Sequence, residues 1–96
     1  MSYICQAISD RRLISFDYDD HYRVVEPHTF GVDKYNQVAL RAYQIRGGSA
    51  SGKTQGWKLF RGAYISGVTL LEETFSGPRR EYRKDDEAFA TIQCQL

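Results

Sequence analysis

The sequence predicts a mostly β domain, in which one short N-terminal helix precedes about five antiparallel strands that curl into a small closed or half-closed barrel. Three observations lead to this prediction. Apolar residues near the N-terminus follow helical spacing. Later segments alternate between apolar and polar residues, as strands do, and glycine-rich or polar stretches separate these segments. A length of 96 residues allows one domain, 1–96. It divides into a helix over 1–12, a barrel over 13–75 and a C-terminal extension over 76–96.

The first third of the chain predicts a helix and a hairpin. Segment 4–11 places its apolar residues at the i, i+3, i+4 spacing of one helix face. Residues 13–27 alternate on both sides of a turn at 19–21, which is typical of a β-hairpin. Pro27 cannot donate a hydrogen bond to a strand ladder, so we expect a strand end or an edge there.

The rest of the chain predicts further strands and one long loop. The strands are expected over 38–45, 57–60 and 65–71, with a bulge near Gly67, and residues 28–32 are expected to extend the hairpin. Gly47 to Gly56 is a long polar loop between two of these strands. The final segment, 85–96, suits a short helix or a strand.

Composition points to a folded domain outside the membrane. No apolar run approaches the roughly 20 residues of a membrane helix, and the N-terminus lacks the apolar core of a signal peptide. We therefore expect a cytoplasmic protein. The two cysteines, Cys5 and Cys94, do not make a disulfide framework, so they are expected to be buried small residues rather than a redox pair.

The net charge of +1 hides an uneven distribution of charge along the chain. Residues 34–71 hold six basic residues and no acidic ones, with aromatic residues between them, whereas both flanks are acidic. Basic residues interleaved with aromatic ones are a weak signal for nucleic-acid binding. The alternative is that these basic side chains cover a sheet surface and pair with the acidic flanks.

One loop matches a phosphate-binding motif, but its context argues against an enzyme. Residues 47–54 fit the pattern G-x-x-x-x-G-K-T completely. A nucleotide-hydrolysing domain needs a helix directly after this loop, whereas residues 55–60 have the character of a strand. We interpret the segment as a flexible hairpin loop whose Lys53 can still contact a phosphate without hydrolysing it.

No other pattern predicts catalysis or a metal site. His21 and His28 lack partners at metal-ligand spacing, and no nucleophile turn accompanies them. The run Asp85–Glu87 is typical of a helix start or a solvated surface. We therefore expect no catalytic residue, no metal ligand, no cofactor and no enzymatic activity.

Several segments together resemble the WYL domain, a family named after a Trp-Tyr-Leu run. The more specific of these segments are Arg23–His28, which reads R-V-V-E-P-H, and Trp57–Arg61, which reads W-K-L-F-R. The similarity covers most of the chain, although Val38-Ala39-Leu40 stands at the namesake triplet. The resemblance implies an Sm-like, SH3-type barrel that acts as a ligand-sensing module in bacterial transcription regulation or phage defence.

The residues and the resemblance together predict a ligand site. We expect three arginines to converge on a phosphate, one aromatic side chain to stack on a base, and lysines to line the rim. The predicted ligand-binding residues are Arg23, His28, Arg41, Tyr43, Trp57, Lys58 and Arg61. Three alternatives stay open: His28 is a satisfied structural residue, Trp57 is part of the core, and Arg61 pairs with Glu26 or an acidic tail residue.

Two classes of function are compatible with the sequence, and each predicts different partners. In the first class the ligand is single-stranded nucleic acid or a nucleotide-like anion, and the chain is a homodimer or works with a separate DNA-binding regulator. In the second class it is a protein-interaction or oligomerisation module without a nucleic-acid ligand, because small barrels expose edge strands.

Overall fold

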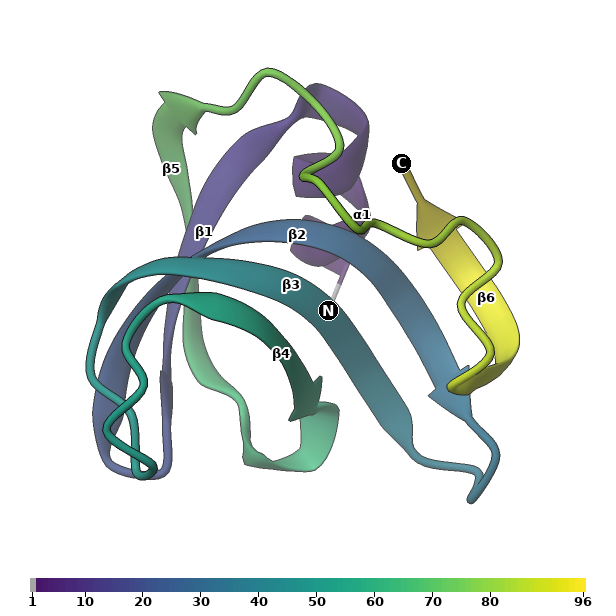
Figure 1. Cartoon of the computed structure of the whole chain (residues 1–96), viewed down its shortest axis with the longest axis horizontal. Helices are drawn as coiled ribbons and strands as arrows, with labels where there is room; N and C mark the ends of the chain where they lie inside the picture. Colours follow the sequence, from purple (N-terminus) through teal and green to yellow (C-terminus); the bar gives the residue numbers. More distant parts are fainter. Residues whose placement is uncertain (1) are drawn as a thin grey trace.

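The structure is a computed structural model that describes residues 2–96. One helix, α1 (Ser2–Asp10), precedes six strands, which are β1 (Arg12–Tyr18), β2 (His21–Asp33), β3 (Val38–Gly47), β4 (Gly56–Arg61), β5 (Ser66–Thr74) and β6 (Phe89–Gln95). A 3-10 turn over Gly62–Tyr64 joins β4 to β5. The strands form one antiparallel sheet in the order β4-β3-β2-β1-β5, and β6 pairs with β2 (Figure 1). The sheet is strongly curved but does not close on itself.

The predicted helix is confirmed and ends where its geometry requires. Ile4, Ala7 and Ile8 are buried on the side that packs on the sheet, where they contribute to the core. Arg11 follows the helix with a φ of 54°, a left-handed conformation that stops helical propagation. The prediction of a helix over 1–12 is therefore right in type and slightly too long, and Met1 lies outside the described residues.

The hairpin between β1 and β2 is confirmed, with a two-residue turn. Asp19 and Asp20 both have positive φ values, 51° and 60°, and Tyr18 pairs with His21. Two successive residues with positive φ match the right-handed twist of the flanking strands, and aspartate tolerates this conformation. This turn brings Tyr18 beside the start of β2, where the candidate site lies.

The expectation for Pro27 is wrong, because this residue lies inside the central strand. On one edge, β2 pairs with β1 through residues 21–25 and then with β6 through residues 29–33. Pro27 falls between these two segments, and the pairing with β3 shifts register directly after it. A residue without an N–H is tolerated there because neither ladder on that edge needs a donor at this position.

The C-terminal extension is part of the sheet. Residues 89–95 form β6 against β2, so the strand alternative for this segment is confirmed and the count rises from five strands to six. At Gly31 an added Cβ would collide with the carbonyl oxygen of Thr91, so only glycine lets β6 approach β2 this closely. Within residues 2–96, no helix has the length and hydrophobicity that a membrane crossing requires.

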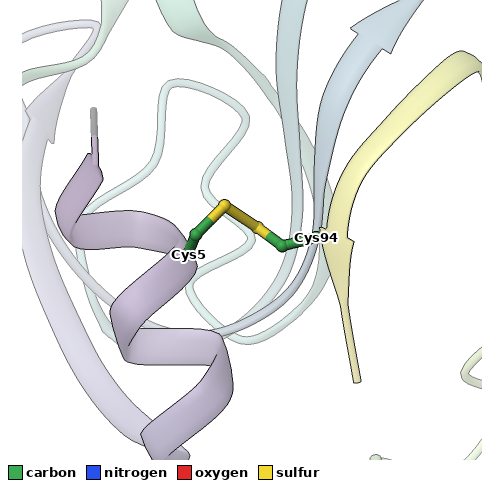
Figure 2. The surroundings of a disulfide bond; sticks show 2 residues. All are labelled: Cys5 and Cys94. Atoms are coloured by element: carbon green, nitrogen blue, oxygen red, sulfur yellow. A yellow bond between two sulfur atoms is a disulfide. The ribbon is translucent and has the colours of Figure 1, made fainter.

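The two cysteines form a disulfide, which corrects the expectation of two separate buried thiols. Cys5 on α1 and Cys94 on β6 are joined across a sequence separation of 89 residues (Figure 2). The two cysteines come close enough to form this bond because β6 pairs with β2 and contacts the helix. The spacing of the cysteines in the sequence does not reveal this contact. The disulfide joins the N-terminal helix to the last strand.

The core lies between α1 and the concave side of the sheet. Phe16 and Phe60 pack edge to face with ring centroids 5.0 Å apart, a favoured aromatic arrangement. The buried apolar cluster consists of Ile4, Ala7, Ile8, Ile14, Phe16, Val25, Phe30, Leu40, Ala42, Phe60 and Ile65. Because Phe60 belongs to this cluster, the residues that alternate with it on β4 point away from the core.

Candidate functional site

The predicted ligand-binding residues separate onto two faces of the sheet. Along β4, Lys58 shares the face of the core residue Phe60, and Trp57 and Arg61 share the opposite face. Cross-strand pairing places Tyr43 opposite Trp57. The predicted convergence of all three arginines on one ligand is therefore wrong. Arg23 contacts the core ring of Phe60, whereas Arg41 and Arg61 lie on the opposite face, and the three arginines line three different pockets.

Arg23 is a buried cation without a carboxylate partner. Its side chain is only 3% exposed and lies against the aromatic rings of Tyr18 and Phe60, with its guanidinium carbon 5.3 and 5.6 Å from the ring centroids. Its terminal nitrogens donate to the Oε1 of Gln44 at 3.2 Å and to the carbonyl oxygen of Tyr18 at 3.1 Å, and its Nε has no partner. Burying an unpaired charge is costly, so this arrangement calls for an anion.

Lys58 lies close to Arg23 at the same end of the sheet. Its ammonium donates to the Oγ of Ser49 at 3.1 Å. Partial burial lowers the pKa of Lys58, and the positive charges of Arg23 and Lys53 lower it further. Within residues 2–96, no ion pair involves Arg23 or Lys58. Positive charge therefore accumulates here without internal neutralisation.

These cations line a pocket of about 290 Å³, here called the Arg23 pocket. Its walls come from the β1–β2 turn, the start of β2, the β3–β4 loop and β4, and they comprise Tyr18, Asp19, Arg23, Ser49, Ala50, Ser51, Lys58, Leu59 and Phe60. The pocket combines two cations, the hydroxyl groups of two serines and aromatic surface. Asp19 is its one carboxylate, and it forms no ion pair with either cation.

The β3–β4 loop contributes hydroxyl groups to this pocket. Ser49 accepts a hydrogen bond from Lys58, and the N–H of Ser51 donates to the Ser49 Oγ at 3.4 Å. Lys53, the lysine of the phosphate-loop pattern, is exposed and is not a wall residue of the pocket. The strand β4 follows the loop directly, which confirms the predicted strand after it.

The opposite face is covered by residues 76–88, here called the strap. The strap leaves the end of β5 and crosses to β6 (Figure 1). Arg79 forms an ion pair with Glu26 at 2.7 Å and stacks over the Tyr43 ring at 4.2 Å. The indole N–H of Trp57 donates to the carbonyl oxygen of Arg80 at 3.1 Å.

Arg41 is neutralised by the same strap. Its Nε donates to the Oδ2 of Asp86 at 2.8 Å, so it forms an ion pair in the structure. Burial is the largest single influence on the pKa of Asp86 and raises it. The hydrogen bonds from Arg41 and from the Ala88 N–H, together with the positive charges of Arg41 and Arg83, outweigh burial, so the pKa of Asp86 is lowered and it faces Arg41 as a carboxylate. Here the alternative in which basic residues pair with the acidic flank is confirmed.

His28 is a satisfied structural residue, which confirms one of its two interpretations. The ring is fully buried, its Nδ1 lies 2.8 Å from the carbonyl oxygen of Glu26, and its Nε2 accepts the N–H of Arg79 at 3.1 Å. A carbonyl can only accept, so Nδ1 carries the proton and the imidazole is neutral. Burial lowers the pKa of His28 accordingly.

Trp57 lies in an aromatic cluster rather than in the main core. Its ring is half-buried and meets His28 edge to face at 4.7 Å and Tyr43 at 5.6 Å. Arg61 is exposed and donates to the Oε1 of Gln37 at 2.9 Å. It forms no ion pair among the described residues, so the alternative in which it pairs with Glu26 or an acidic tail residue is wrong. Glu26 forms its ion pair with Arg79 instead, because the strap brings that arginine onto the face of the sheet where Glu26 lies.

Sequence reasoning missed Ser49 and Ser51 as pocket residues, and Arg79 and Asp86 as covering residues. The loop motif drew attention to the correct segment but to the wrong side chains. Residues 2–96 contain no cluster of three or more metal-ligating side chains. Comparisons with protein-family models, curated proteins and solved structures found no match for this chain.

Proposed function

We propose that this chain is a ligand-sensing module that binds the phosphate of single-stranded nucleic acid or of a nucleotide-like anion in the Arg23 pocket. One observation carries the proposal. A buried arginine and a lysine of lowered pKa line one pocket, and neither of them contacts a carboxylate.

The chemistry of the pocket fits a phosphate group. Arg23 and Lys58 supply two cations to the pocket wall, and the hydroxyl of Ser49 already contacts the Lys58 ammonium. Hydrogen bonds between ionised groups are the strong ones, and arginine suits phosphate because its donors are held in a planar fork. A bound phosphate would neutralise a buried charge that the protein itself leaves unpaired.

The resemblance to WYL domains extends this proposal beyond the pocket. It supports an Sm-like, SH3-type barrel and a regulatory, non-enzymatic role in bacterial transcription or phage defence. The partner in that setting is a second copy of the chain or a separate DNA-binding regulator. The curved six-stranded antiparallel sheet behind one short helix is compatible with such a barrel.

Fluorescence anisotropy with a labelled single-stranded oligonucleotide at two salt concentrations tests the proposal. We expect Lys58→Gln to weaken binding at least about tenfold, because a hydrogen bond to a charged group contributes roughly 1.5–3 kcal/mol. The dependence of log K on log salt should also fall by about 0.7 for the lost phosphate contact.

The matched control is Lys34→Gln, which removes the same charge from the exposed β2–β3 turn, beyond the end of β2 opposite Arg23 and outside the pocket walls. This variant should bind almost as tightly as the wild type. Equal affinity of wild type and Lys58→Gln would contradict the assignment of the pocket.

A second candidate function is a protein-interaction or oligomerisation module. It is favoured by the open sheet, whose order ends in β4 on one side and β5 on the other. An edge strand can pair with a strand of another chain. Gel filtration over a dilution series distinguishes the two candidates, since a stable oligomer that binds no oligonucleotide would favour the second.

A further inference from the structure

The strap makes contacts that resemble those of a bound nucleotide. A carboxylate of Asp86 lies on Arg41 at 2.8 Å, where a phosphate oxygen would make the same charge-assisted hydrogen bond. The planar guanidinium of Arg79 lies over Tyr43 at 4.2 Å, where an aromatic base would stack. The carbonyl of Arg80 accepts the indole N–H of Trp57 at 3.1 Å, as a base carbonyl would.

We infer that Arg41, Tyr43 and Trp57 form a second binding surface, for an aromatic base and its phosphate, that the strap fills as an internal competitor and that the Cys5–Cys94 disulfide keeps closed. This surface lies on the face opposite the Arg23 pocket, so the inference goes beyond the proposed function and does not depend on it. The shared ligand chemistry is that of a free nucleotide or a single strand.

The strap is held mainly by polar contacts and by its two ends. Apart from Gly77, none of its residues is buried, and Arg80, Arg83 and Lys84 are exposed. At its start, the Arg11 side chain donates to the carbonyl of Ser76 at 3.1 Å. At its end it continues into β6, which pairs with β2. A segment with little buried apolar surface opens at a lower free energy than the core does.

The disulfide joins the helix to β6, the strand into which the strap continues. Because β6 has only β2 as a strand neighbour among the described residues, the bond from Cys94 to Cys5 is its covalent link to the helix (Figure 2). Both cysteines are only half-buried, so a small dithiol can reach them. The chemical step is thiol–disulfide exchange with a dithiol reductant.

The exchange balances in electrons and protons. A thiolate of the reductant attacks one cysteine sulfur, the Cys5–Cys94 bond breaks, and a mixed disulfide forms. The second thiol of the reductant displaces the remaining cysteine, so the reductant ends as a disulfide and the protein as two thiols, with two electrons and two protons transferred. After this step only noncovalent contacts keep the surface covered. They are the pairing of β6 with β2, the hydrogen bonds of the strap, its ion pairs with Arg41 and Glu26, and its contacts with aromatic rings.

The test compares oxidised and reduced full-length protein that carries Lys58→Gln, so that the contribution of the Arg23 pocket is reduced and is the same in both redox states. The probe is a fluorescein-labelled 12-mer of oligothymidylate, and thymidine 5′-monophosphate serves as competitor. A tethered competitor acts at an effective concentration near the millimolar range, so we expect reduction with dithiothreitol to tighten binding about tenfold or more. Equal affinity in both redox states would overturn the inference.

Two variants confirm that the gain comes from the covered surface. Arg41→Gln should remove the gain on reduction, whereas Arg61→Gln should keep it, because Arg61 lies on the same face and contacts Gln37 rather than the strap. If thymidine monophosphate displaces the 12-mer at similar phosphate concentration, the ligand is a single nucleotide. If it does not, the ligand is a strand.

Asp86→Asn tests the same inference without reduction, in case the reduced chain unfolds. In the oxidised protein this variant removes the carboxylate from Arg41 and should tighten binding of the 12-mer, and unchanged binding would count against the second surface. A separate comparison, made only in the oxidised state, tests the Arg23 pocket. Loss of binding in oxidised Lys58→Gln relative to oxidised wild type supports the pocket whether or not reduction has any effect.

Discussion

The Arg23 pocket and the strap-covered surface lie on opposite faces of the same strands and differ in how their cations are neutralised. On the pocket side, Arg23 and Lys58 have no carboxylate partner. On the strap side, Arg41 pairs with Asp86 and Arg79 pairs with Glu26. Residues of the same type are therefore neutralised within the protein on one face and stay without a counter-ion on the other.

The largest expected effect is the loss of the disulfide, which acts on the strap side. Replacing both cysteines, Cys5→Ser with Cys94→Ser, should lower the free energy of unfolding by about 4 kcal/mol, because a link across 89 residues restricts the unfolded chain strongly. Urea denaturation measures this loss. A change below about 1 kcal/mol would mean that the bond contributes little to holding α1 and β6 together.

The second prediction concerns the ion pair that joins the strap to β2. Arg79→Ala should lower the free energy of unfolding by about 1–2 kcal/mol, because it leaves the buried carboxylate of Glu26 without its cation. Arg46→Ala is the matched control, since the pair of Arg46 with Glu73 is exposed and contributes much less. Equal losses in the two variants would show that the strap-side pair has no special importance.

The third and smallest prediction concerns the pocket side and has the opposite sign. Lys58→Met should leave the free energy of unfolding unchanged or raise it by about 0.5 kcal/mol, since it removes repulsion with Arg23. Added sulfate should raise the melting temperature of the wild type more than that of the variant, because an anion stabilises the state it binds. A clear destabilisation by Lys58→Met would show that this lysine is structural.

The fold was largely predictable because local patterns carried it. Alternation identified β1, β3 and β4, and the helical spacing of Ile4 and Ile8 identified α1. The role of Pro27 was not predictable, because it depends on β1 and β6 sharing one edge of β2. Which strands share an edge is a long-range property that no local window contains.

The candidate site was predictable in composition but not in arrangement. The basic block contains Lys58 and the loop that bears Ser49, which line the pocket with Arg23. The alternation of side chains along a strand correctly placed Arg41 and Tyr43 on one face. The counter-ions Asp86 and Glu26 could not be assigned, because the sequence does not show where the strap crosses the sheet.

The sequence by itself determined the mostly β composition, the leading helix, the hairpin turn at Asp19-Asp20 and the alternation of side chains along β4, because these depend on residues close together in the chain. The tertiary structure alone decided the pairing of Cys5 with Cys94 and the ion pairs of the strap. It also decided which cations stay without a partner. Charge neutralisation acts over a few ångströms in space, and only the folded chain brings residues 45 or more positions apart to that distance.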